Sequence, residues 1–84
     1  MALLTRSRTR TRREESVEIQ EKRFGYFPKT FRWHGKHYDV QAIERCWTLA
    51  RRTPRLCFRV RCREGVFDLA QDVRANTWTL ALRT

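Results

Sequence analysis

The sequence lacks any apolar run of the roughly 20 residues that a bilayer-spanning helix needs. The opening residues Met1–Leu4 are too short for the apolar region of a secretory signal, and charged residues follow at once. The Arg/Ser/Thr-rich residues 1–13 resemble an organelle transit peptide in composition, but a basic arm is the simpler interpretation. These features predict a cytoplasmic protein that has no membrane partner.

Acidic residues are also scarce. The chain has 9 Asp and Glu against 19 Lys and Arg, which gives a formal net charge of +10 over 84 residues. This length allows one small domain with a thin core, and it makes a second domain, a solenoid or a large catalytic cleft unlikely on size alone. A charge this positive attracts polyanions, so the composition favours nucleic acid, DNA or RNA, as a partner.

Motifs for catalysis or metal binding are missing. The chain has three cysteines, Cys46, Cys57 and Cys62. An odd number fits reduced thiols better than a disulfide framework. Cys57 and Cys62 differ by an odd number of positions and face opposite ways on a continuous strand, and a tight hairpin need not bring His34 and His37 together. We therefore expect no metal, no cofactor and no enzymatic activity, with Cys46 and Cys62 as small core residues.

The composition changes near residue 16. Residues 1–16 contain five arginines and two glutamates, with no aromatic residue and no apolar periodicity. Such a segment cannot bury enough surface to offset its ordering entropy. We predict a disordered basic arm over 1–16 and a single small β domain over 17–84. The arginines of the arm are Arg6, Arg8, Arg10, Arg12 and Arg13.

Strand-like alternation dominates the rest of the chain. Val17 and Ile19 alternate with polar residues, and the run from Phe31 to Val40 contains His34-Gly35-Lys36, which is typical of a tight hairpin. Residues 41–52 fit either a short helix or a strand; we favour a strand entered through a bulge near Gln41-Ala42. Later segments predict a strand over 56–63, a Glu64-Gly65 turn, a return strand from Val66, and a last strand over 77–82 with Trp78, Leu80 and Leu82 inward. The pattern predicts an all-β fold, a meander of about five antiparallel strands in a twisted sheet or SH3-like open barrel.

Arginines alternate with apolar residues between Leu56 and Arg63. Arg59, Arg61 and Arg63 lie on one face at a spacing of roughly 7 Å, comparable to the phosphate spacing of an extended nucleic-acid strand. Guanidinium groups bind phosphate bidentately, so this face is a candidate phosphate-binding track. Arg51, Arg52 and Arg55 extend it into the preceding loop. The alternative is a solvated face on which Glu44, Asp68 and Asp72 pair with the arginines.

Aromatic residues are the second candidate. Most of the ten are needed for a thin sheet core, and we expect Trp33, Tyr38, Phe58 and Trp78 to be structural. Phe24, Tyr26 and Phe27 lie beside Lys29, where exposed rings stack on unpaired bases or anchor a protein partner. Capping of the core by this loop is the third alternative.

Several positions together carry a resemblance to a known family. They are Phe31, Trp33, Gly35, Tyr38, Val40, Trp47, Phe58, Val60, Gly65, Phe67, Leu69, Asp72, Trp78 and Leu80. This pattern is similar to a small bacterial domain family of unassigned function, which occurs free-standing or at the C-terminus of Y-family (translesion) DNA polymerase-like proteins. The resemblance implies a role near DNA, in contact with DNA or with a polymerase partner, and it implies no catalytic residue.

The sequence thus predicts a non-enzymatic nucleic-acid-binding accessory protein in a DNA-repair context, which binds the phosphate backbone without strong sequence specificity. The alternative is a protein–protein interaction module, or a small subunit of a repair, transcription or ribosomal assembly. In that case sheet edges or the aromatic loop would bind a protein, and the arginines would meet an acidic surface.

Overall fold

The computed structural model describes residues 14–50 and 52–82, and all its regular structure is β. The seven strands are β1 (Glu14–Ser16), β2 (Glu18–Arg23), β3 (Phe27–Trp33), β4 (Lys36–Leu49), β5 (Arg55–Cys62), β6 (Gly65–Asp72) and β7 (Thr77–Leu82). The all-β antiparallel prediction is confirmed, whereas the expected count of about five strands is too low. Residues 14–16, which the sequence placed in the arm, form β1, and Arg55, which it placed in a loop, begins β5.

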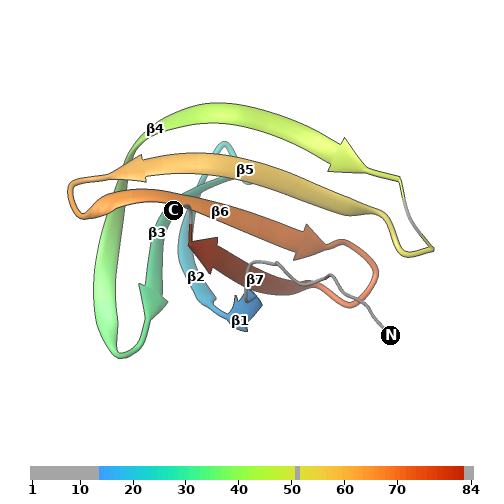
Figure 1. Ribbon diagram of the computed structural model, residues 1–84, viewed down its shortest axis with the longest axis horizontal. Coiled ribbons are helices and arrows are strands. Elements are labelled where there is room, and N and C mark those ends of the chain that lie inside the picture. Colours follow the sequence, from blue (N-terminus) through green and yellow to red (C-terminus); the bar gives the residue numbers. More distant parts are fainter. Residues whose placement is uncertain (1–13, 51, 83–84) are drawn as a thin grey trace, which may run out of the picture.

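The strands form one antiparallel sheet in the order β1-β7-β6-β5-β4-β3-β2, which curls into a half-barrel (Figure 1). The two edge strands are consecutive in the chain and meet at Val17. The Val17 amide donates a hydrogen bond of 3.2 Å to the Trp78 carbonyl of β7. Glu15 of β1 accepts a 3.2 Å hydrogen bond from the Trp33 indole at the end of β3. The first strands therefore tie together the two ends of the curled sheet.

The hairpin between β3 and β4 is confirmed. Trp33 pairs with Lys36, so the loop contains only His34 and Gly35. Both loop residues have positive φ, 53° and 73°. This is the backbone of a type I′ turn, whose twist matches the flanking strands, and it explains the need for glycine at position 35.

Strand β4 is long and bent, and it shapes the site described below. Residues 41–49 are a strand, and the pairing with β5 shifts between Val40 and Ala42, as the predicted bulge requires. A second shift follows between Ile43 and Arg45. The first residues of β4 pair with β3 up to Asp39, and the remainder pairs with β5. Beyond Asp39, β3 and β4 therefore diverge.

The core lies inside the curl, where aromatic and aliphatic side chains of β3 to β7 meet. Phe31, Phe58, Val60 and Leu69 are fully buried. The inward face predicted for β5 is confirmed at Phe58, Val60 and Cys62, and Leu56 packs partly buried against them, whereas Cys57, which the alternation placed on the outer face, is also buried. Of the aromatic residues expected to be structural, Tyr38, Phe58 and Trp78 are buried, and Trp33 packs partly buried against them.

Three local predictions about the core and turns are wrong. Leu82 is 46% exposed because it occupies the last position of β7. Cys46 is exposed, although it pairs with the buried Phe58, whereas Cys62 is buried as expected. The turn after β5 is Arg63-Glu64, since Cys62 already pairs with Gly65.

No segment within residues 14–50 and 52–82 forms a helix that is long and apolar enough to cross a membrane.

Candidate nucleic-acid interface

The arginine track of β5 is largely neutralised by carboxylates of its own sheet. Arg59 pairs in register with Asp68 of β6, and their side chains form two hydrogen bonds, of 3.0 and 3.4 Å. The hydrogen bonding that Arg59 donates to Asp68 raises the pKa of the guanidinium above its ordinary value. Arg59 also lies 5.4 Å from the ring of Trp47. Since the carboxylate of Asp68 is almost fully buried, it requires this partner.

Two further arginines of the track are paired. Arg61 lies 3.5 Å from Glu44, and Arg55 lies 3.1 Å from Glu14. Arg63, in the turn after β5, and Arg52 are both exposed. Neither has a carboxylate partner among residues 14–50 and 52–82. The structure thus favours the solvated, acid-paired alternative for most of this face. Arg51 and the arm arginines Arg6, Arg8, Arg10, Arg12 and Arg13 lie outside the described residues.

The end of the β2–β3 hairpin differs from the arginine track. A three-residue loop joins Arg23 to Phe27, closed by a 3.1 Å hydrogen bond from the Tyr26 amide to the Arg23 carbonyl. Phe24 is 86% exposed and Tyr26 is 42% exposed. Phe24 also has a positive φ of 58°, which is uncommon for a bulky residue. His34 has a similar φ of 53° in the turn between β3 and β4, so this backbone fits a tight hairpin turn, and the exposed ring is what makes this loop a candidate binding element.

Three exposed cations surround this loop and have no ion pair among the described residues: Lys22, Arg23 and Lys29. Lys22 lies 5.7 Å from the ring of Trp78. No acidic residue occurs between Lys22 and Lys29 in the sequence. We call Lys22, Arg23, Phe24, Tyr26 and Lys29 the hairpin tip. The tip combines unpaired positive charge with exposed aromatic surface, which is the combination that binds single-stranded nucleic acid.

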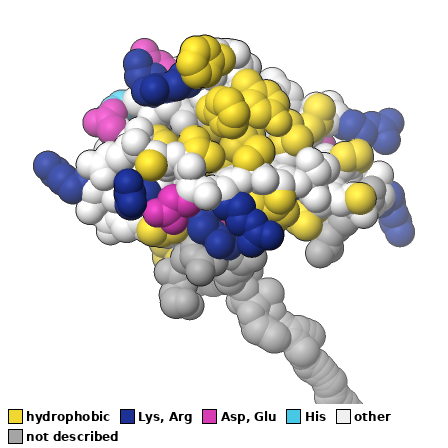
Figure 2. All heavy atoms as spheres, turned by 90° about the horizontal axis from the view of Figure 1, so that it is seen from above, with side chains coloured by type: hydrophobic (Ala, Val, Ile, Leu, Met, Phe, Trp, Pro, Cys, Tyr) yellow, Lys and Arg dark blue, Asp and Glu magenta, His cyan; other side chains and the backbone are white. Residues whose placement is uncertain are grey.

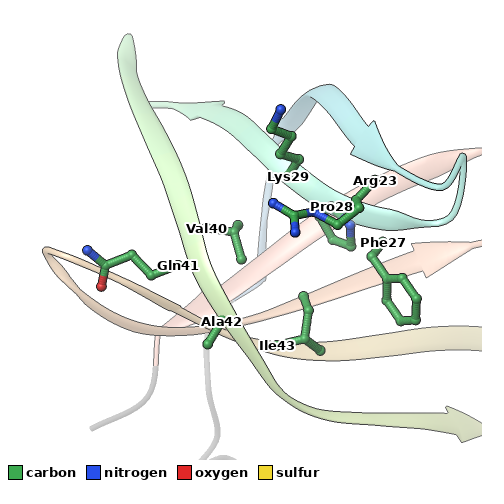
Figure 3. Close-up of a pocket in the computed structure, with 8 residues that line it drawn as sticks. All are labelled: Arg23, Phe27, Pro28, Lys29, Val40, Gln41, Ala42 and Ile43. Atoms are coloured by element: carbon green, nitrogen blue, oxygen red, sulfur yellow. The ribbon is translucent and has the colours of Figure 1, made fainter.

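A cavity of about 250 Å³ opens beside the tip, where β3 and β4 diverge (Figure 3). Phe27 and Pro28 of β3 face Val40 and Ile43 of β4 across it. The guanidinium of Arg23 extends over Pro28 toward Val40, whereas Gln41 and the amine of Lys29 are directed away from the cavity. The space-filling view in Figure 2 shows hydrophobic side chains gathered on one face with Lys and Arg side chains around them.

The structure answers the open question about Phe24, Tyr26 and Phe27 in two ways. Phe27 caps the core, since its ring packs edge-on against Phe58 at 5.9 Å, and Tyr26 does so in part, since its ring packs edge-on against Phe58 at 5.7 Å. Phe24 keeps most of its surface exposed. The alternation of the sequence pointed to this loop, but it did not identify Lys22 and Arg23 or the β4 residues of the cavity. The sequence contained one signal for Arg23, which is its position directly before Phe24.

Possible metal ligands do not gather at one place in the part of the chain that the structure describes. There, no group of three His, Cys, Asp or Glu residues is placed to hold a metal ion. His34 contacts Glu15, and His37 contacts Gln20 and Asp39. Burial raises the pKa of the Cys62 thiol to about 11, and burial also raises the pKa of Cys57. These two thiols are therefore poor nucleophiles at neutral pH.

Comparison with protein-family models, curated proteins and solved structures finds no match to this chain.

Proposed function

We propose that the protein is a non-enzymatic nucleic-acid-binding accessory protein that contacts the phosphate backbone without strong sequence specificity, and that the hairpin tip is its principal contact. The observation that supports this proposal is the grouping of Lys22, Arg23 and Lys29, all without a carboxylate partner among the described residues, around the exposed ring of Phe24. Elsewhere, acids of the same sheet offset several of the cations, as at Arg55, Arg59 and Arg61.

The charge distribution supports a polyanion over an uncharged ligand. A phosphate that approaches Arg59 must compete with Asp68, whose carboxylate already accepts two hydrogen bonds. A phosphate that approaches Arg23 or Lys29 displaces water only, because neither side chain has an ionic partner in the described chain. Phosphate contacts of this kind position a protein on nucleic acid but carry no sequence information.

The DNA-repair or translesion context and the polymerase partner in the proposal rest on the sequence resemblance alone. A cytoplasmic location is proposed from the odd number of cysteines, and a closer relation of this half-barrel to SH3-like open barrels is proposed from the strand pattern. Arg52, Arg63 and the basic residues 1–13 are expected to add phosphate contacts beyond the tip.

A salt titration of binding to single-stranded DNA tests the proposal. Each phosphate contact contributes about −0.7 to the slope of log K against log salt on a single strand. The combined change Lys22→Ala, Arg23→Ala and Lys29→Ala removes three tip cations and should make the slope shallower by about 2. The measurement is fluorescence anisotropy of a labelled oligonucleotide over a series of salt concentrations.

The chain offers a matched control. The combined change Lys36→Ala, Arg55→Ala and Arg61→Ala removes the same charge from residues that are already ion-paired. Its slope should stay close to that of the unaltered protein. Equal slopes for the two triple variants, or an affinity of the unaltered protein that does not change with salt, would contradict the proposal.

One observation favours the protein–protein interaction module as a second candidate. Among the described residues, β4 beyond Asp39 pairs only with β5, and from Arg45 to Leu49 that pairing is regular, which leaves a regular open edge on this last stretch of β4. An open edge can accept an added strand from a partner. A pulldown repeated after complete nuclease digestion separates the two candidates, because only partners held by nucleic acid are lost.

A further inference from the structure

We infer that the cavity between β3 and β4 holds one unpaired base of a single-stranded nucleic acid, while Arg23 and Lys29 bind the phosphates on either side of it. This inference rests on the proposed function and narrows its ligand from nucleic acid in general to a strand with unstacked bases. It also explains why Arg23 and Lys29 lie next to an apolar opening.

The size and lining of the cavity suit one ring system. Its volume of about 250 Å³ lies below the roughly 300–1,000 Å³ of sites for drug-sized ligands. The walls are mainly apolar, from Phe27, Pro28, Val40 and Ile43. A nucleobase presents two flat apolar faces that such walls can cover. A base inside a duplex reaches such a cavity only after it has been flipped out, so a single strand is the favoured ligand.

The aromatic wall is rigid before any ligand arrives. The ring of Phe27 packs edge-on against Tyr26 at 4.8 Å and against Phe58 at 5.9 Å. Phe58 is fully buried, so it anchors this group to the core. A wall that is already ordered loses little conformational entropy on binding. The guanidinium of Arg23 extends toward Val40 (Figure 3), where it can stack on a base or bind its phosphate.

Charge distinguishes this cavity from two others in the described structure. In one of them Glu18 lies with Lys22, and in the other Asp39 and Glu64 lie with Lys36 and Arg63, so each lining mixes acids and cations. The β3–β4 cavity is lined by Arg23 and Lys29 and by no carboxylate. Its charged lining residues are thus all cations, which suits a ligand that carries phosphates next to an apolar ring.

The same opening is poorly suited to an added peptide strand. Pro28 on the β3 side has no amide hydrogen to donate. On the β4 side, the pairing shifts at Val40/Ala42 and again at Ile43/Arg45. Such bulges disturb the regular spacing of hydrogen-bonding groups that strand addition requires. The observations therefore favour a base over an extended peptide.

The test compares two probes with equal numbers of phosphates: a labelled oligothymidylate and an abasic oligomer of the same length. The unaltered protein should bind the oligothymidylate roughly 5- to 100-fold more tightly, as expected for a base that stacks on protein. The variant Val40→Phe fills the cavity and should bind the two probes with similar affinity. Equal binding of both probes by the unaltered protein would overturn the base site and leave phosphate binding intact, whereas binding of neither would overturn the proposed function itself.

A second variant covers the case in which Val40→Phe fails to fold. Arg23→Ala alters an exposed side chain and should reduce the preference for the oligothymidylate, because it removes the group that lies over the cavity mouth. The matched control is Arg32→Ala, which removes an exposed arginine of β3 that does not line the cavity and has no ion pair within residues 14–50 and 52–82. An unchanged preference in Arg23→Ala, or an equal reduction in both variants, would overturn the inference and leave the cavity for another occupant, such as a peptide.

Discussion

At the scale of single residues, neighbours decide which arginines are available. Arg59 and Arg23 carry the same group, but Arg59 lies beside a buried carboxylate and Arg23 lies beside an apolar cavity. The alternation in β5 predicts the face on which Arg59 lies. It does not predict the partner, because the β5–β6 register decides that Asp68 stands opposite Arg59. Availability for phosphate therefore depends on pairing between strands.

The buried Cys62 gives a prediction for stability against pH. Its thiol has a pKa of about 11 in the folded protein and 9.0 as the ordinary value. As pH rises from 9 to 11, the unfolded chain loses this proton before the folded protein does, so stability falls with rising pH. We expect a loss of about 1–2 kcal/mol in the free energy of unfolding over this range. Urea unfolding followed by tryptophan fluorescence measures it.

The variant Cys62→Val is the control for this loss. Valine fills a similar volume and cannot ionise, so the variant should show a shallower fall in stability over the same pH range. Other groups that titrate there contribute equally to both proteins and cancel in the difference. Parallel curves for the two proteins would show that ionisation of this thiol does not contribute to the fall in stability.

At the scale of elements, the two hairpins that share β3 use positive φ in the same way. His34 and Gly35 form the short turn that the strand twist requires. Phe24 and Gly25 have similar positive φ values, and the Tyr26 amide closes their turn on the Arg23 carbonyl. The two turns differ in that the second places a large aromatic ring in solvent.

The variant Gly35→Ala tests the first of these turns. A Cβ at position 35 would meet nothing within 4 Å, so the cost comes only from the backbone at a φ of 73°. We expect a loss of about 1–2 kcal/mol in the free energy of unfolding. Gly35→Asn should lose less, because Asn tolerates this conformation. Thermal or urea unfolding of both variants measures these losses. Full stability of Gly35→Ala would contradict the requirement for glycine in this turn.

How much the sequence predicts depends on how local each feature is. The β3–β4 hairpin and the bulge near Gln41 follow from short patterns, and both are present. Strand β1 has no such pattern, since Glu14–Ser16 is a strand only because β7 lies beside it. The cavity arises where β3 and β4 diverge, which is a property of the curled sheet. The loop with Phe24 was predictable from the sequence as a candidate binding loop. The β4 residues that line the cavity, from Val40 to Ile43, were not predictable.

At the scale of the whole molecule, the fold separates two kinds of surface. The face of β5 and β6 contains acids and arginines that neutralise each other. The hairpin tip keeps its positive charge and lies next to an apolar cavity. The net charge of +10 attracts polyanions to the whole molecule, and the tip is where we expect a bound strand to rest.

The most direct test of this account is a backbone amide NMR titration with an oligothymidylate. We expect the largest chemical-shift changes at residues 22–29 and 40–43, with small changes along β5 and β6. Changes concentrated on Arg59 and its neighbours, or no changes at any residue, would contradict the account.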